Sequence, residues 1–149
     1  MAFQDFNPRM TPRQLFAIVF IEGFCSLGAE VLALRQLIPH TGSTIVVTAP
    51  TIGLFLLALA LGYHAGARVA DAYVGTVARN FILAAFIAAF GRAGNTVDAI
   101  FTHLGPPVLG YFVFVGAVLC PLAYLLGQTV PILTNLMKHE RAGEKSGYA

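Results

Sequence analysis

Four long apolar stretches alternate with short polar segments along this chain. Each stretch is close to the roughly 20 residues that a helix needs to cross about 30 Å of hydrocarbon. The polar segments between them are too short to form a second folded domain. The pattern therefore predicts an all-α integral membrane protein with four transmembrane helices, at about residues 15–38, 45–66, 76–96 and 108–127.

Polar residues and prolines mark the ends of the last two stretches. Arg92 lies in the second half of the third stretch, where a charge is costly. The fourth stretch is followed by Gln128, Thr129 and Pro131, and a proline removes a backbone donor and restricts the residue before it, so we expect a helix break there. The domains predicted are an N-terminal arm (1–14), a transmembrane domain (15–128) and a C-terminal tail (129–149).

Basic residues near the ends of the stretches predict how the helices are oriented. Lys and Arg in short loops favour the cytoplasmic side. Seven of them lie on the side of the two termini and two on the other side, which predicts that the arm and the tail are both cytoplasmic. The seven are Arg9, Arg13, Arg68, Arg79, Lys138, Arg141 and Lys145, and the two are Arg35 and Arg92.

Composition supports lipid as the surrounding medium. Of the 149 residues, 57% are hydrophobic and 11% are charged, against about 25% charged residues in an ordinary soluble domain. The formal net charge is only +2, so we expect no nucleic-acid partner. Cys25 and Cys120 lie in apolar sequence without a ligand motif, so we expect no metal or other cofactor.

Two carboxylic residues lie within the first apolar stretch. Near a helix centre such a group costs about 2.5 to 3.5 kcal/mol, so Glu22 and Glu30 should face protein or water. Their separation of eight residues places them about 80° apart around the helix and about 12 Å apart along it. Ser26 lies one turn from each, so the three side chains can share one broad face.

The depth of other polar residues suggests partners for these carboxylates. Arg92 and Arg35 are expected at the depth of Glu30, but five residues turn a helix by about 140°, so Glu30 and Arg35 are badly oriented for each other. We therefore expect Glu30 to pair with Arg92 between helices, and Glu22 to lie near His64. These six polar residues (Glu22, Ser26, Glu30, Arg35, His64 and Arg92) either fix the packing register of the helices or form a proton or cation relay.

Glycines in the second stretch predict close helix packing. Gly62 and Gly66 form a G-x-x-x-G pattern, and Gly53 lies further along the same helix. Small residues at this spacing let two helix backbones approach each other. We interpret all three as helix-packing residues, because glycine is too frequent in membrane helices to indicate a dimer by itself.

Three parts of the chain resemble a bacterial family. The sequences GAEVLALR (residues 28–35), LALGY (59–63) and LGQTVPIL (126–133) occur in order, with Gly42-Ser43 after the first and residues 68–71 after the second. They resemble the membrane domain of bacterial membrane-bound spermidine synthase-like proteins, which is distantly similar to major facilitator transporters. The resemblance implies a helical membrane domain in the bacterial inner membrane.

The chain also departs from that family. Its members resemble longer helical bundles followed by a soluble aminopropyltransferase domain, which we expect to be absent here. The sequence has no glycine-rich loop for a nucleoside cofactor and no acidic pair placed for a polyamine. The transferase activity of the family is therefore not expected.

Two functions remain open on the sequence. The first is a noncatalytic membrane subunit that packs in or stabilises a larger membrane complex, or that anchors a separately encoded soluble enzyme. The alternative is a half-transporter or channel for protons, cations or polyamines, built by homo-oligomerisation. An enzyme is not expected, because no nucleophile, base and orienting group share one plausible site.

Overall fold

The protein is all-helical in the part of the chain that the computed structural model describes, residues 12–42, 45–69 and 73–146. Seven α-helices and two short π-helical segments follow one another along the described residues. They are α1 (Pro12–Thr41), α2 (Ile45–Ala67), α3 (Tyr73–Phe86), η1 (Ile87–Gly91), α4 (Gly94–Leu104), α5 (Pro107–Phe114), η2 (Val115–Leu119), α6 (Cys120–Gly127) and α7 (Thr129–Ser146).

Among the described residues, four helices are long and apolar enough to cross a membrane, as the sequence predicts. They are Arg13–Thr41, Ile45–Ala67, Tyr73–Gly91 and Pro107–Met137. The first two agree with the predicted spans to within three residues at each end. The fold is therefore that of an all-α, multi-pass membrane protein with four spans.

The third and fourth spans end at other residues than expected. The third stops at Gly91, and the segment predicted as a loop after residue 96 contains α4 instead. The fourth does not end at Gly127: Gln128 is a single turn residue with helical backbone angles, and the helix continues through Pro131. Pro131 lies in the first turn of α7, where a proline is tolerated because no intrahelical bond needs its missing N–H.

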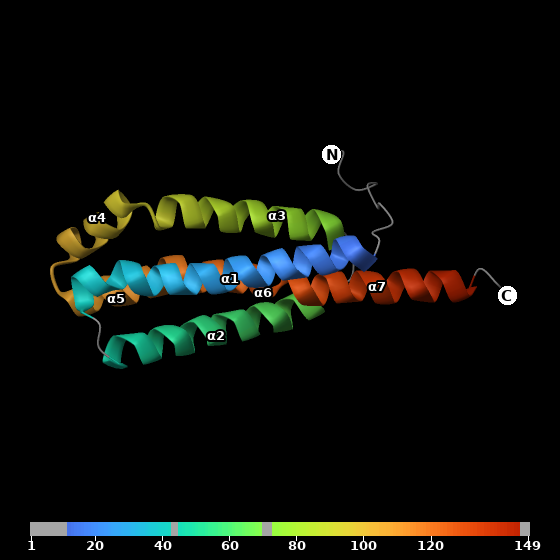
Figure 1. Ribbon diagram of the computed structural model, residues 1–149, viewed down its shortest axis with the longest axis horizontal. Coiled ribbons are helices and arrows are strands. Elements are labelled where there is room, and N and C mark those ends of the chain that lie inside the picture. Colours follow the sequence, from blue (N-terminus) through green and yellow to red (C-terminus); the bar gives the residue numbers. More distant parts are fainter. Residues whose placement is uncertain (1–11, 43–44, 70–72, 147–149) are drawn as a thin grey trace.

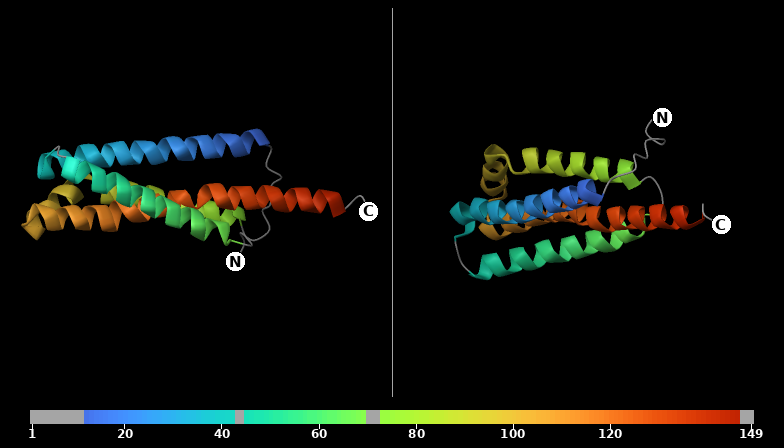
Figure 2. Two further views of the ribbon diagram at one scale, coloured as in Figure 1. Left: turned by 90° about the horizontal axis from the view of Figure 1, so that it is seen from below. Right: turned by 45° about the vertical axis from the view of Figure 1, so that its right-hand side comes forward.

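The long helix made of α5, η2, α6 and α7 lies at the centre of the arrangement (Figure 1). α2 lies along one side of this central helix, α3 lies along the other, and α1 covers it between them. α1 begins and α7 ends at the same end of the bundle, called here the tail end. The opposite end carries the short helix α4 and is called the α4 end. Figure 2 shows that α2 crosses the central helix obliquely.

The buried apolar side chains form three clusters stacked along the bundle. The largest lies toward the α4 end and contains Phe55, Phe114 and Leu119. A second, around Ala29, Ala84, Leu122 and Leu126, lies in the middle. The third, around Leu15, Val77, Ile132 and Leu133, lies at the tail end. Each of the last two clusters contains residues from α1, α3 and the central helix.

Candidate functional site

Five buried polar residues lie between the middle cluster and the tail-end cluster. On each of three helices they follow residues of one cluster and precede residues of the other, so they occupy one level of the bundle. We call them the polar layer: Glu22 and Ser26 on α1, Asn80 on α3, and Gln128 and Thr129 on the central helix, each at most 9% exposed.

One direct hydrogen bond crosses this layer. The Nδ2 group of Asn80 donates to Oε1 of Gln128 at 2.8 Å, with both residues buried. The bond joins α3 to the central helix at the single-residue turn between α6 and α7. Sequence reasoning missed Asn80, although its spacing with Val77 and Ala84, at i−3 and i+4, places it on the buried face of α3.

Glu22 lies on the buried face of α1 and is only 3% exposed. Within the described part of the chain, its carboxyl group forms no hydrogen bond or ion pair. His64, the neighbour that the sequence predicted, is exposed, and no contact joins it to Glu22 among the described residues.

The structure does not pair Glu30 with Arg92. The Nε2 group of Gln36 donates to the Arg92 carbonyl oxygen at 2.7 Å, and Arg92 Nε lies 3.4 Å from Gln36 Oε1. Arg92 is thus level with Gln36, which is six residues or about 9 Å along α1 from Glu30. Glu30 is half-buried and Arg35 is exposed. The expected ion pair was wrong because the third span ends before Arg92.

Two of the three predicted glycines lie where α2 crosses α6. A Cβ atom on Gly62 would collide with the Tyr124 carbonyl oxygen, and one on Gly66 would lie 2.5 Å from the Gln128 carbonyl oxygen. On the other side, a Cβ on Gly127 would lie 2.5 Å from the Leu59 carbonyl oxygen. These three glycines form a backbone-to-backbone contact, which we call the glycine seam.

Gly53 does not belong to this seam. It is exposed, and a Cβ atom there would meet nothing within 4 Å. Nine residues separate it from Gly62, which turns the helix by about 180° and places Gly53 on the opposite face. Its interpretation as a packing residue within this chain was therefore wrong.

A separate group of polar contacts holds α4 at the other end of the bundle. His40 Nε2 lies 3.4 Å from Asp98 Oδ1, and the His40 ring stacks on Phe101 with ring centroids 4.3 Å apart. With the Gln36–Arg92 contacts, these interactions join the last two turns of α1 to α4 and to the residue that follows the third span.

The chemistry available at the polar layer is limited to a carboxyl group, two amides and two hydroxyl groups. They can fix helix register or hold a proton or a cation. No group of three or more His, Cys, Asp or Glu side chains that could hold a metal ion occurs among the described residues. In comparisons with known proteins, no family model, curated protein or solved structure matches the chain.

Proposed function

We propose that this chain is a noncatalytic subunit of a larger membrane complex, in which α1 packs against another membrane protein. The observation that carries the proposal is a second apolar stripe on α1. Phe16, Phe20, Phe24, Leu27 and Val31, called here the α1 stripe, are each 54% to 74% exposed. Their spacing of three and four residues places them in one row along the helix.

The α1 stripe points away from the rest of the chain. Taking about 100° per residue, its centre lies about 140° from the buried row that contains Leu15, Ser26 and Ala33. The contacts that α1 makes with the other helices lie on the side of the buried row and not on the stripe. The rings of Phe16, Phe20 and Phe24 lie one helical turn apart and form a ridge against which another helix can pack. Aromatic residues are enriched at the centres of protein interfaces.

The distribution of burial agrees with this role. The share of the most apolar segment that is buried within the chain is 17% in α1, 22% in α2 and 17% in the third span, against 44% in the central helix, so α1 is one of three peripheral spans. A peripheral helix with an apolar outer row suits docking of helix against helix. In the proposed orientation the tail end faces the cytoplasm of a bacterium, where the part of α7 that extends beyond the other helices can meet a soluble partner. The chain would then also be able to anchor a separately encoded enzyme, as the family resemblance suggests.

The composition of a gently extracted complex tests this proposal. After mild detergent extraction, we expect intact-mass measurement to find the chain with a second membrane protein at fixed stoichiometry. The double variant Phe20→Ala and Phe24→Ala should lose that partner. The double variant Leu56→Ala and Leu57→Ala removes exposed apolar side chains from α2 instead, and it should retain the partner. A wild-type chain that extracts alone would overturn the proposal.

A second function is favoured by the polar layer. Glu22 is a buried carboxylic residue at the same level of the bundle as two hydroxyl groups and two amides, and such a layer suits a half-transporter or channel for protons or cations. Four spans are few for a complete transporter, so several copies would be needed. The purified wild-type chain in liposomes would then conduct, and Glu22→Gln would abolish the flux. Glu30→Gln, at the half-buried position, would have the smaller effect.

A further inference from the structure

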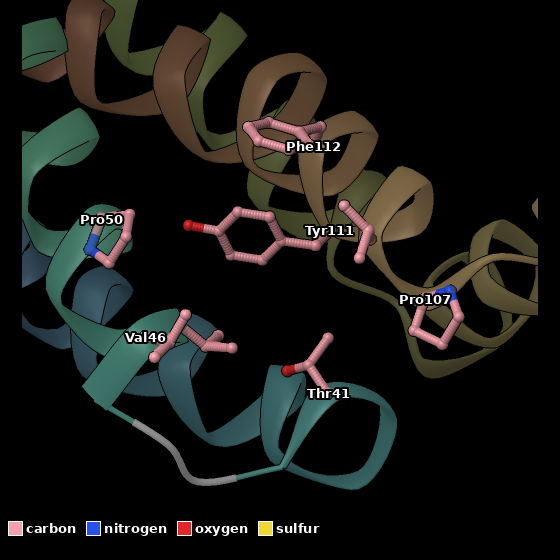
Figure 3. A pocket seen from close by; sticks show the side chains of 8 residues that line it. Thr41, Val46, Pro50, Pro107, Tyr111 and Phe112 are labelled. Carbon is pink, nitrogen blue, oxygen red and sulfur yellow. The ribbon is translucent and has the colours of Figure 1, made fainter.

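A cavity at the α4 end is lined almost entirely by apolar groups. It has a volume of about 310 Å³ and lies between the first turns of α2 and α5, with the last turn of α1 beside it (Figure 3). Val46, Val47 and Pro50 form one wall, and Pro107, Val108 and Phe112 form the other. Tyr111 lies between the walls (Figure 3).

The polar atoms at this cavity already have partners. Thr41 donates its hydroxyl hydrogen to the Leu37 carbonyl oxygen at 2.9 Å. Thr51 donates to the Val47 carbonyl oxygen at 2.7 Å, so Tyr111 donates to Thr51 Oγ1 across the 3.1 Å between their oxygens. The Tyr111 ring is therefore fixed in place. A ligand that needs hydrogen-bond donors finds none free among these three hydroxyl groups, which leaves hydrocarbon as the matching chemistry.

The cavity is continuous with the surface of the chain that faces lipid. Val46, Val108 and Phe112 are 76%, 66% and 59% exposed, so the rim of the cavity is part of the apolar surface of the spans. A cavity of about 150 Å³ lined by apolar side chains is known to hold one benzene molecule. By the same ratio, 310 Å³ accommodates about twelve carbons of a flexible chain.

We propose that this cavity binds one acyl chain of a membrane phospholipid from the leaflet at the α4 end. Lipid is the medium in contact with the rim, and the chain can enter sideways from the bilayer without passing through water. The methylene groups of the acyl chain would pack against Pro50, Tyr111 and Phe112. They would exchange contacts with mobile lipid for contacts with ordered side chains of the protein. The bound lipid would add to the Thr51–Tyr111 hydrogen bond a second connection between the start of α2 and the start of α5.

Photo-crosslinking in vesicles tests this site. The chain is reconstituted in phosphatidylethanolamine and phosphatidylglycerol containing a phospholipid with a diazirine on its acyl chain. We expect labelling to concentrate on residues 46–50 and 107–112, several-fold above the equally exposed apolar positions Phe20 and Phe24 of α1. Uniform labelling of all exposed apolar positions would show only the ordinary surrounding lipid and would overturn the proposal.

A filling variant and a matched control sharpen the test. Val47→Phe adds a ring to the cavity wall and should reduce the labelling of residues 107–112 several-fold. Leu56→Phe enlarges an exposed apolar residue of the same helix about 13 to 14 Å nearer the tail end, so it should leave the labelling unchanged. Val108→Phe fills the cavity from the opposite wall and replaces Val47→Phe if that variant fails to fold.

A second measurement does not depend on labelling chemistry. Native mass spectrometry of the detergent-extracted chain should show about one retained phospholipid for the wild type and for Leu56→Phe. The two filling variants should have lost it. Cross-links between two copies of the chain at residues 107–112, in place of lipid adducts, would mean that a second copy occupies the cavity and would also overturn the proposal.

Discussion

The contact of α6 with α2 differs from the contacts that the same helix makes with α1 and α3. α2 approaches through missing side chains, because Gly62, Gly66 and Gly127 leave backbone against backbone. α1 and α3 approach through side chains, as in the cluster of Ala29, Ala84, Leu122 and Leu126 and in the polar layer. The first contact tolerates no added atom, whereas the second can repack. Position-specific substitutions should therefore affect the two contacts to different extents.

The largest effect is expected at the glycine seam. Gly62→Ala places a methyl group against the Tyr124 carbonyl oxygen, which cannot move without shifting the helix. Overpacking costs typically 1 to 3 kcal/mol, and we expect about 3 kcal/mol here because the obstacle is backbone. The free energy of unfolding in mixed micelles, followed by circular dichroism, would measure it.

The same helix offers a control for this substitution. Gly53→Ala adds the same methyl group where nothing lies within 4 Å, and alanine is the better helix former. It should leave stability unchanged or raise it by up to about 1 kcal/mol. Equal destabilisation by the two substitutions would contradict the seam.

An intermediate effect is expected in the polar layer. Asn80→Leu removes the donor to Gln128 Oε1 and leaves a buried amide without that partner. Hydrogen bonds between membrane helices contribute about 0.6 kcal/mol on average, with a maximum near 1.7, and an unpaired buried group adds its own cost. We expect a loss of about 1 to 2 kcal/mol in the same unfolding measurement.

A double-mutant cycle separates the bond from the packing at these positions. If the bond matters, Asn80→Leu combined with Gln128→Leu should cost clearly less than the sum of the two single substitutions. Additive costs would mean that the two amides are only neighbours.

The smallest effect is expected where α1 contacts α4. His40→Ala removes both the stacking on Phe101 and the contact with Asp98. Asp98 is 70% exposed, so the ionic part contributes little, and we expect less than about 1 kcal/mol of global stability. Faster amide hydrogen exchange confined to residues 94–104 is the expected signature. Faster exchange throughout α1 would mean that α4 supports the whole bundle.

The spans were predictable because length and apolar content alone decide whether a helix can cross hydrocarbon. The phase of Gly62 and Gly66 was also visible in the sequence, since four residues return to nearly the same helix face. The relative depth of residues on different helices could not be predicted from the sequence. The depth of Arg92 in the bundle depends on where α3 and η1 end. The apolar pattern predicts neither a π-helical segment nor the following α4. Asn80 was missed because a neutral amide gives no charge signal.

The fourth span is longer than a bilayer core requires. Its 31 residues from Pro107 to Met137 extend for about 46 Å, and α7 continues to Ser146 beyond the other helices (Figure 1). Gln128 keeps helical backbone angles where α6 meets α7, so the rod is mechanically continuous across that residue. One continuous helix therefore connects the segment beyond the other helices to the backbone contact of Gly127 with Leu59 inside the bundle.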